Sequence, residues 1–155
     1  MLLGGMDTTG AVVLLVALLL AGVAAWWLRT RSGAVRTTGA GVTEGREDVE
    51  VLRSLGVRPE DADLTVVQFA TAFCAPCRAT KARLAQLQTR HPGLAAVHVD
   101  AESHLDAVRA LDVRRTPTLF YLGRGDELLG RSSGAPRPDE LQALVAAHAP
   151  ATDPV

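Results

Sequence analysis

Two cysteines separated by two residues are the pair in this chain with evident chemistry. Cys74 and Cys77 are the only cysteines among its 155 residues. They follow a β-rich apolar run at 64–70 and open a stretch with helical character at 77–90. Two thiols on one helical turn can close a small disulfide and open it again. The placement predicts a thiol–disulfide redox protein in which one sulfur is a reactive thiolate.

The two sulfurs are expected to have different roles. A helix start carries roughly half a positive charge from its unpaired backbone N–H groups, and such motifs lower a cysteine pKa from about 8.5 to about 3.5–7.5. Cys74, on the outer side, is therefore the expected nucleophile, and Cys77, one turn in, is the expected resolving cysteine. Pro76 suits the first helical turn because it has no N–H to leave unpaired. Arg78 adds positive charge nearby.

Two other interpretations of the pair are weaker. A two-residue gap closes a strained ring, which disfavours a purely structural disulfide. A zinc site needs two more ligands, but the chain has no second C-x-x-C, and its four histidines show no ligand spacing. We interpret these histidines as surface or turn residues: His91, His98, His104 and His148. No metal and no organic cofactor is expected, and the redox group is the Cys74–Cys77 disulfide itself.

An alternation of strands and helices surrounds the pair. We expect strands at 64–70, 94–99, 118–122 and 127–131, and helices at 77–90, 104–111 and 138–148. Strands joined by helices, then a hairpin, then a closing helix predict an α/β sandwich with a central mixed sheet flanked by helices.

Residues 11–28 are an apolar run without a charge. As a helix the run would span roughly 27 Å, close to the hydrocarbon core of a bilayer at about 30 Å. Trp26 and Trp27 stand near its end, where interfacial aromatic residues are expected. No Lys or Arg precedes the run, which disfavours a cleaved signal peptide. The sequence therefore predicts one transmembrane helix ahead of the redox domain.

Charge around this run predicts its orientation. Arg29, Arg31 and Arg36 follow it directly, so the positive-inside rule places the redox domain in the cytoplasm. The extracytoplasmic orientation stays open, because a redox cysteine pair fits a reducing or an oxidising compartment. We expect this order: a tail at 1–10, the anchor at 11–28, a flexible linker at 29–62, the redox domain at 63–149, and a tail at 150–155. The linker could include a short helix at 47–55.

Two motifs resemble the thioredoxin family. Residues 66–78, VVQFATAFCAPCR, are similar to its strand, active site and helix, and residues 113–119, VRRTPTL, are similar to its second signature, a proline that opens a strand. Ser133-Gly134-Ala135 also matches a family turn. Two motifs in this order, about forty residues apart, are a specific signal. The resemblance covers about residues 63–149.

The resemblance implies a substrate site. The Thr116–Pro117 bond would be cis, and Pro117 would lie against the cysteines, leaving the backbone of Thr116 to pair with an extended substrate. Phe73, Ala75 and Pro76 would complete an apolar surface for disulfide-containing proteins. The implied partners also include an electron donor, either a flavoprotein reductase or another thiol protein. A net charge of −1 argues against nucleic acid, and we expect a monomer.

Three positions depart from the family pattern. Phe73 replaces the usual Trp, Gln68 replaces a buried Asp, and Ala96 replaces a common Lys. The Asp–Lys pair is credited with proton handling at the resolving cysteine, whereas Gln68 can form hydrogen bonds but cannot titrate. Asp100 and Glu102 follow the second strand, and we assign neither a catalytic role.

The sequence therefore predicts a membrane-tethered thiol–disulfide oxidoreductase. One alternative is an extracytoplasmic thiol protein that serves disulfide handling or cytochrome maturation. The other is a non-catalytic module whose thiols hold a metal, such as Cu(I), or a partner protein.

Overall fold

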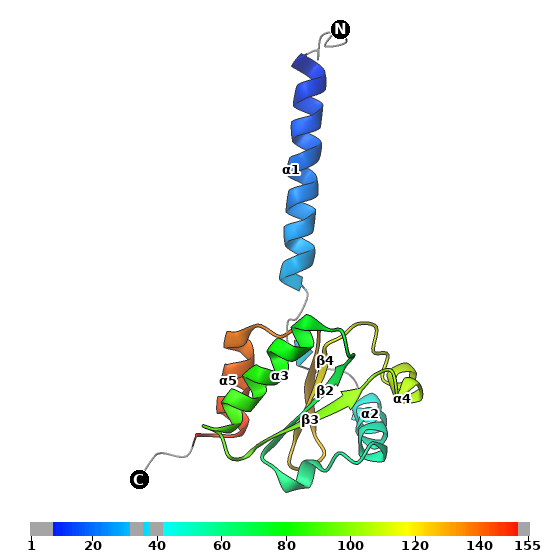
Figure 1. The fold of residues 1–155 in the computed structure, drawn as a ribbon, viewed down its shortest axis with the longest axis vertical. Coiled ribbons are helices and arrows are strands. Elements are labelled where there is room, and N and C mark those ends of the chain that lie inside the picture. The colour runs from blue at the N-terminus through cyan, green and yellow to red at the C-terminus, as the bar shows by residue number, and fades with distance from the viewer. Residues whose placement is uncertain (1–7, 32–35, 38–41, 152–155) are drawn as a thin grey trace. The chain divides into compact units, whose positions relative to one another are not determined.

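The computed structural model describes residues 8–31, 36–37 and 42–151 and divides the chain into two compact units, residues 1–32 and 33–155. The described part of the first unit is one helix, α1 (Thr8–Arg31) (Figure 1). The second unit contains β1 (Arg36–Thr37), α2 (Val42–Ser54), the 3₁₀ helix η1 (Pro59–Asp61), β2 (Leu64–Ala70), α3 (Ala75–Gln88), β3 (Leu94–Asp100), α4 (Leu105–Ala110), β4 (Thr118–Gly123), β5 (Leu128–Ser133) and α5 (Pro138–His148).

The strands form one mixed sheet in the order β1-β5-β4-β2-β3. Strands β2 and β3 are parallel, with Gln68 beside His98, and the other neighbours are antiparallel. The first six residues of β2 are buried, because β2 lies between β3 and β4 with helices over both faces. This position explains why β2 reads as a continuous apolar run rather than an alternating one.

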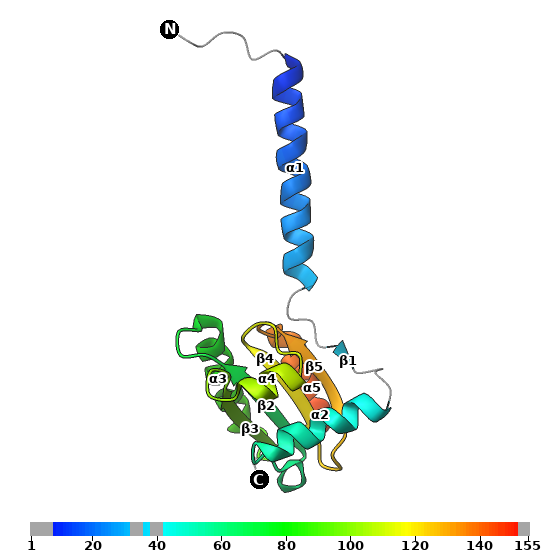
Figure 2. The same ribbon diagram turned by 90° about the vertical axis from the view of Figure 1, so that its right-hand side faces the viewer.

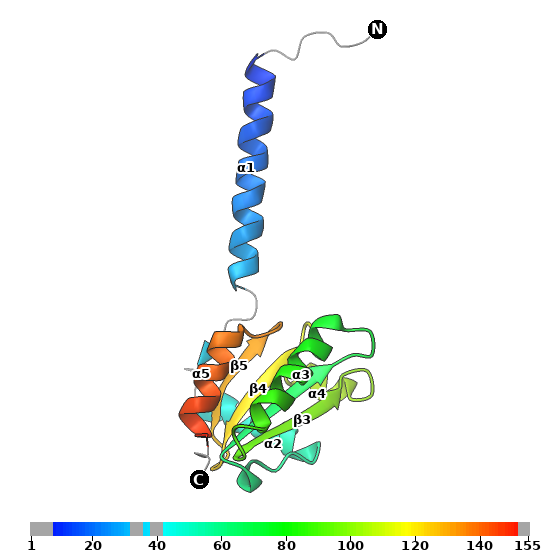
Figure 3. The same cartoon turned by 60° about the vertical axis from the view of Figure 1, so that its left-hand side comes forward.

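Helices cover both faces of the sheet. Figure 2 shows α2 and α4 on one face, and Figure 3 shows α3 and α5 on the other. Successive residues of β2 point to opposite faces: Val66 packs in the core under α3 and α5, and Val67 packs in the core under α2 and α4. The α/β sandwich with a central mixed sheet, predicted from the sequence, is confirmed.

The segment predicted as a linker at 29–62 carries more structure than expected. Strand β1 lies beside β5 (Figure 2), and the two pair with Arg36 beside Arg131. Helix α2 is longer than the short helix anticipated at 47–55, and its Val49 and Leu52 are buried in the core. The compact redox unit therefore begins before residue 63, since part of its sheet and one helical layer come from this segment.

Helix α1 includes the apolar run at 11–28. Within residues 8–31, 36–37 and 42–151, no helix has the combined length and apolarity that a membrane crossing demands. By that measure, the predicted transmembrane span is not found.

Candidate active site

The two cysteines form a disulfide at the start of α3. Their Cα atoms lie 5.2 Å apart. Cys74 is the N-cap residue, and the backbone N–H of Cys77 donates to Cys74 Sγ at 3.1 Å. Pro76 occupies the first turn, as predicted. A sulfur that accepts a hydrogen bond from a helix N-terminus is in a position that stabilises a thiolate in the reduced state.

Exposure differs across the active-site turn. Cys77 is 3% exposed and Cys74 is 9% exposed, so Cys74 is the more accessible sulfur. Phe73 extends from the turn with 97% of its surface exposed, and Ala75 and Pro76 are also exposed. The turn therefore presents apolar side chains on either side of the accessible cysteine.

The loop before β4 reaches the same end of the sheet. The Thr116–Pro117 peptide bond is cis, as predicted. In the antiparallel register Phe69 of β2 lies beside Thr118 of β4, so the proline loop ends where β2 leads into the active-site turn. The hydroxyl groups of Thr71 and Thr116 lie 3.5 Å apart and join the two segments.

Main-chain contacts fix the proline loop. The Gly134 N–H donates to the carbonyl oxygen of Pro117 at 2.8 Å. Gly134 has φ +97°, a conformation that a residue with a side chain rarely adopts. Pro117 is buried and Thr116 is half-buried. The family-like turn at 133–135 thus has a physical role, because it holds the cis proline in place.

Gln68 of β2 contacts the backbone of Cys77. It is 1% exposed, and its Nε2 donates to the main-chain oxygen of Cys77 at 2.9 Å. Its Oε1 has no hydrogen-bond partner among the described residues. Gln68 also borders a cavity of about 330 Å³ that reaches Cys77. The residue that replaces the expected buried Asp is therefore a neutral hydrogen-bonding group beside the resolving cysteine.

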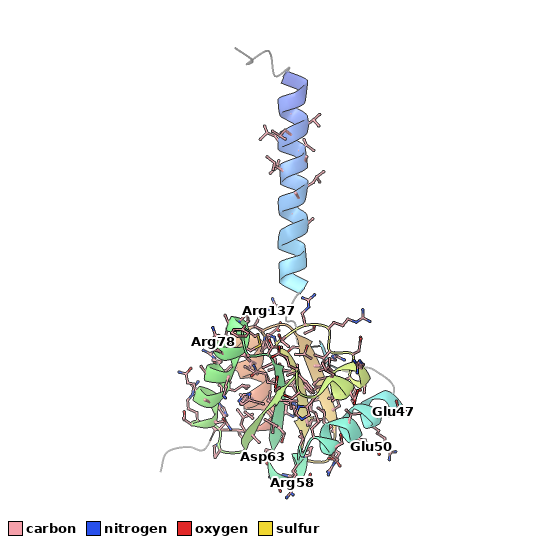
Figure 4. The ribbon with its side chains drawn as sticks, turned by 45° about the vertical axis from the view of Figure 1, so that its right-hand side comes forward. Glu47, Glu50, Arg58, Asp63, Arg78 and Arg137 are labelled. Carbon is pink, nitrogen blue, oxygen red and sulfur yellow. A yellow bond between two sulfur atoms is a disulfide. The ribbon has the colours of Figure 1, made fainter. Side chains whose placement is uncertain are left out.

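The same cavity is lined by polar and charged side chains from β3, α3 and the following loop: Arg78, Lys81, His98, Asp100 and Glu102. Burial and the nearby Lys81 ammonium lower the pKa of His98 below its usual value. Hydrogen bonds from the Ser103 hydroxyl and the Glu102 N–H lower the pKa of the Asp100 carboxyl. Figure 4 shows Arg78 at the end of the domain opposite Asp63, which precedes β2.

One residue of the cavity beside Cys77 was not singled out from the sequence. His98 is exposed, as expected of a surface residue, and the structure places it in β3, where it lines the cavity beside Cys77. Its position opposite Gln68 follows from the parallel register, which no local pattern reveals. His91 lies in the turn after α3, as expected, but it is buried, and its Nδ1 lies 2.6 Å from the carbonyl oxygen of Ala149.

A second missed residue holds the loop before the cis proline. Arg131 of β5 donates to the carbonyl oxygens of Leu111 and Asp112 at 3.1 and 3.2 Å. Its guanidinium carbon lies 5.0 Å from the ring centroid of Phe120. Within the part of the chain that the structure describes, no cluster of three or more His, Cys, Asp or Glu side chains is arranged to hold a metal ion.

Comparison with known proteins gives concordant matches. A family model described as thioredoxin matches residues 57–147. Thioredoxin H4-1 of Oryza sativa subsp. japonica is 31% identical over 90 residues, which cover 58% of this chain and 67% of that protein. Thioredoxin-2 of Pyricularia oryzae is 30% identical over 122 residues, which cover 79% of this chain and 66% of that protein. The matched regions thus span about two thirds of these relatives' own length.

Solved structures also match part of the chain. Thioredoxin f2 of Chlamydomonas reinhardtii superimposes with a TM-score of 0.54 at 24% identity, covering 63% of this chain and 90% of that one. At this identity the likeness concerns the fold alone.

Proposed function

The chain belongs to the thioredoxin family and is a thiol–disulfide oxidoreductase, and we propose that it reduces disulfides of other proteins while tethered to a membrane. Cys74 is the nucleophile and Cys77 the resolving cysteine. The observation that carries these roles is the hydrogen bond from the Cys77 N–H to Cys74 Sγ at the start of α3, together with the lower exposure of Cys77.

The reaction proceeds in two exchanges. The Cys74 thiolate attacks one sulfur of a substrate disulfide, forms a mixed disulfide and releases the other substrate sulfur as a thiolate. Cys77 loses its proton and attacks Cys74 Sγ, which forms the Cys74–Cys77 bond and releases the second substrate thiolate. The two electrons gained by the substrate come from the two protein thiols. An electron donor, either a flavoprotein reductase or another thiol protein, returns the pair to the reduced state.

The substrate would bind over the apolar surface beside the disulfide. Phe73, Ala75 and Pro76 are exposed there, and the backbone of Thr116, which precedes the cis Pro117, is placed to pair with an extended segment. Main-chain pairing gives affinity without requiring a particular sequence. This arrangement suits a protein that acts on more than one disulfide substrate.

Substitution of each cysteine tests the two roles. With insulin as substrate and dithiothreitol as donor, Cys74→Ser is expected to abolish disulfide reduction. Cys77→Ser is expected to accumulate a mixed disulfide at Cys74, which mass spectrometry detects. Full disulfide reduction by Cys74→Ser would contradict the proposal. A mixed disulfide that forms readily on Cys77 in that variant would also contradict it.

The membrane tether rests on α1 and its sequence. Its described large apolar side chains are exposed, from 49% at Val16 to 68% at Leu19, and such a surface is unfavourable in water. The complete apolar run at 11–28 approaches the thickness of a bilayer core. Arg29 and Arg31 follow it, which favours a redox domain on the cytoplasmic side.

A flotation assay with vesicles of phosphatidylcholine and phosphatidylglycerol tests this tether. The full chain is expected to float with the vesicles, and Leu18→Glu combined with Leu19→Glu is expected to remain in the dense fraction. Ala82→Glu combined with Gln86→Glu, on the exposed side of α3, adds the same charge and is expected to float. Equal flotation of both double variants would contradict the tether. Protease digestion of sealed cells then distinguishes the cytoplasmic from the extracytoplasmic orientation.

A further inference from the structure

The resolving cysteine needs a proton acceptor. Cys77 is 3% exposed, and only its thiolate can attack the mixed disulfide on Cys74. The hydrogen bond at the helix start favours a thiolate at Cys74, because the Cys77 N–H points to that sulfur. A group that can take a proton must therefore lie close to Cys77 or be connected to it.

The cavity beside Cys77 limits the choice. Gln68 borders it but cannot titrate. Arg78 and Lys81, both from α3, are cations at neutral pH and have no site for another proton. Asp100 and Glu102 are carboxylates, which are weak bases for a thiol, and hydrogen bonds lower the pKa of Asp100 further. His98 is the remaining titratable group that lines the cavity among the described residues.

His98 is well placed for this role. It is the β3 partner of Gln68 in the parallel register, so both side chains point to the face of the sheet that α3 covers. Its side chain is also exposed, so it lies between the cavity and solvent. Burial and the Lys81 ammonium lower the pKa of His98, which leaves the imidazole neutral and able to accept a proton at pH 7.

We propose that His98 accepts the Cys77 proton through water in this cavity when the mixed disulfide is resolved. The inference rests on the role of Cys77 proposed above. The proton passes from the Cys77 thiol to water and from water to the neutral nitrogen of His98. The Cys77 thiolate then attacks Cys74 Sγ, and the bond between Cys74 and the substrate sulfur breaks, with its electron pair leaving on the substrate. Solvent protonates the released thiolate and takes the proton from His98.

Single-turnover kinetics of the full, reduced chain test the proposal. An aromatic disulfide that releases a coloured thiolate reports two phases. The first is bimolecular and follows attack by Cys74, and the second is unimolecular and follows attack by Cys77. His98→Asn is expected to leave the first phase unchanged and to slow the second about tenfold or more at pH 7. At high pH the two proteins should converge, because hydroxide then removes the thiol proton.

Three further variants sharpen the test. His98→Gln, which keeps hydrogen-bonding capacity without a titratable group, is expected to be as slow as His98→Asn. Lys81→Met is expected to move the lower inflection of the second phase to higher pH, because it removes the cation that lowers the pKa of His98. His148→Asn, at the end of α5, is the matched control and is expected to leave both phases unchanged.

The outcomes separate this inference from the proposed function. A second phase that keeps the wild-type rate in His98→Asn at every pH would overturn the role of His98 and leave the role of Cys77 intact. A wild-type rate in His98→Gln alone would also overturn it, since proton transfer would then be unnecessary. Absence of any second phase in the wild-type chain would overturn both.

Discussion

Gln68 Nε2 donates a hydrogen bond of 2.9 Å to the main-chain oxygen of Cys77. This bond joins strand β2 to the first turn of α3, and the glutamine is 1% exposed. The buried position below the resolving cysteine therefore holds a neutral group that fixes the backbone and does not titrate. Proton exchange at Cys77 must then involve other residues, which directs attention to the cavity and His98.

Replacing Gln68 with Leu should destabilise the domain. The change removes the buried hydrogen bond to Cys77, which is expected to cost about 1 kcal/mol of the free energy of unfolding. Urea denaturation of the oxidised protein measures this cost. Gln86→Leu, on the exposed side of α3, is the control and should lie within about 0.5 kcal/mol of wild type. Equal stability of the two variants would show that the bond contributes nothing.

Tyr121 should make the domain less stable in alkali. Burial raises the pKa of Tyr121 from its ordinary value of 10.0 to about 12, and its hydroxyl lies 2.9 Å from Ser132 Oγ. Above pH 10 the unfolded tyrosine ionises while the folded one stays protonated. The contribution of the protonated Tyr121 to the free energy of unfolding is therefore fully present below pH 10. It is lost, by about 2–3 kcal/mol, as the pH rises toward 12.

Tyr121→Phe isolates this contribution. Denaturation across pH 9 to 12 should show a smaller loss of stability in the variant, because Phe has no proton to release. The single lysine, Lys81, is present in both proteins and does not affect the difference between them. Parallel pH profiles for the two proteins would contradict a raised tyrosine pKa.

Phe73→Ala should weaken the binding of protein substrates selectively. The side chain is 97% exposed beside the accessible cysteine, and covering a Phe side chain is worth roughly 1.5–3 kcal/mol. We expect KM for insulin to rise about tenfold or more, with little change in the reaction with a small aromatic disulfide. A proportional loss with both substrates would indicate damage to the cysteines instead of a docking contact.

Arg131→Lys should loosen the loop that carries the cis proline. A lysine cannot donate to the carbonyl oxygens of Leu111 and Asp112 from one planar group. We expect a loss of about 1–2 kcal/mol in urea denaturation. Arg109→Lys, whose side chain is 72% exposed in its ion pair with Asp106, should change stability very little. If both variants lose the same free energy of unfolding, the hydrogen bonds from Arg131 do not stabilise the loop before the cis proline.

Local patterns in the sequence predicted most of the fold. Strand β2 matches the predicted run at 64–70, because it is a short apolar run with clear ends. Helix α5 matches the predicted helix at 138–148, because its apolar residues recur at helical spacing. Helix α3 begins at Ala75, two residues earlier than predicted, because Cys74 caps it. Strand β1 was missed since it is two residues long, and its pairing with β5 joins segments far apart in the chain.

The candidate site was predictable where its residues are adjacent in sequence. The cysteine pair and the cis proline each belong to a short motif, and residues next to each other in the sequence are enough to recognise it. The roles of His98, Gln68 and Arg131 depend on strand register and on contacts across the sheet. A pattern along the chain does not encode such contacts, so the group that handles the Cys77 proton could be inferred only from the fold.

The acidity of the Cys74 thiol tests the central claim most directly. The rate of alkylation by iodoacetamide, measured against pH in the reduced Cys77→Ser variant, reports the thiolate fraction at Cys74. We expect a half-maximal rate between about pH 3.5 and 7.5, as for thiols at helix N-termini. An inflection near pH 8.5, the value of an unperturbed cysteine, in a folded sample would contradict the proposed nucleophile.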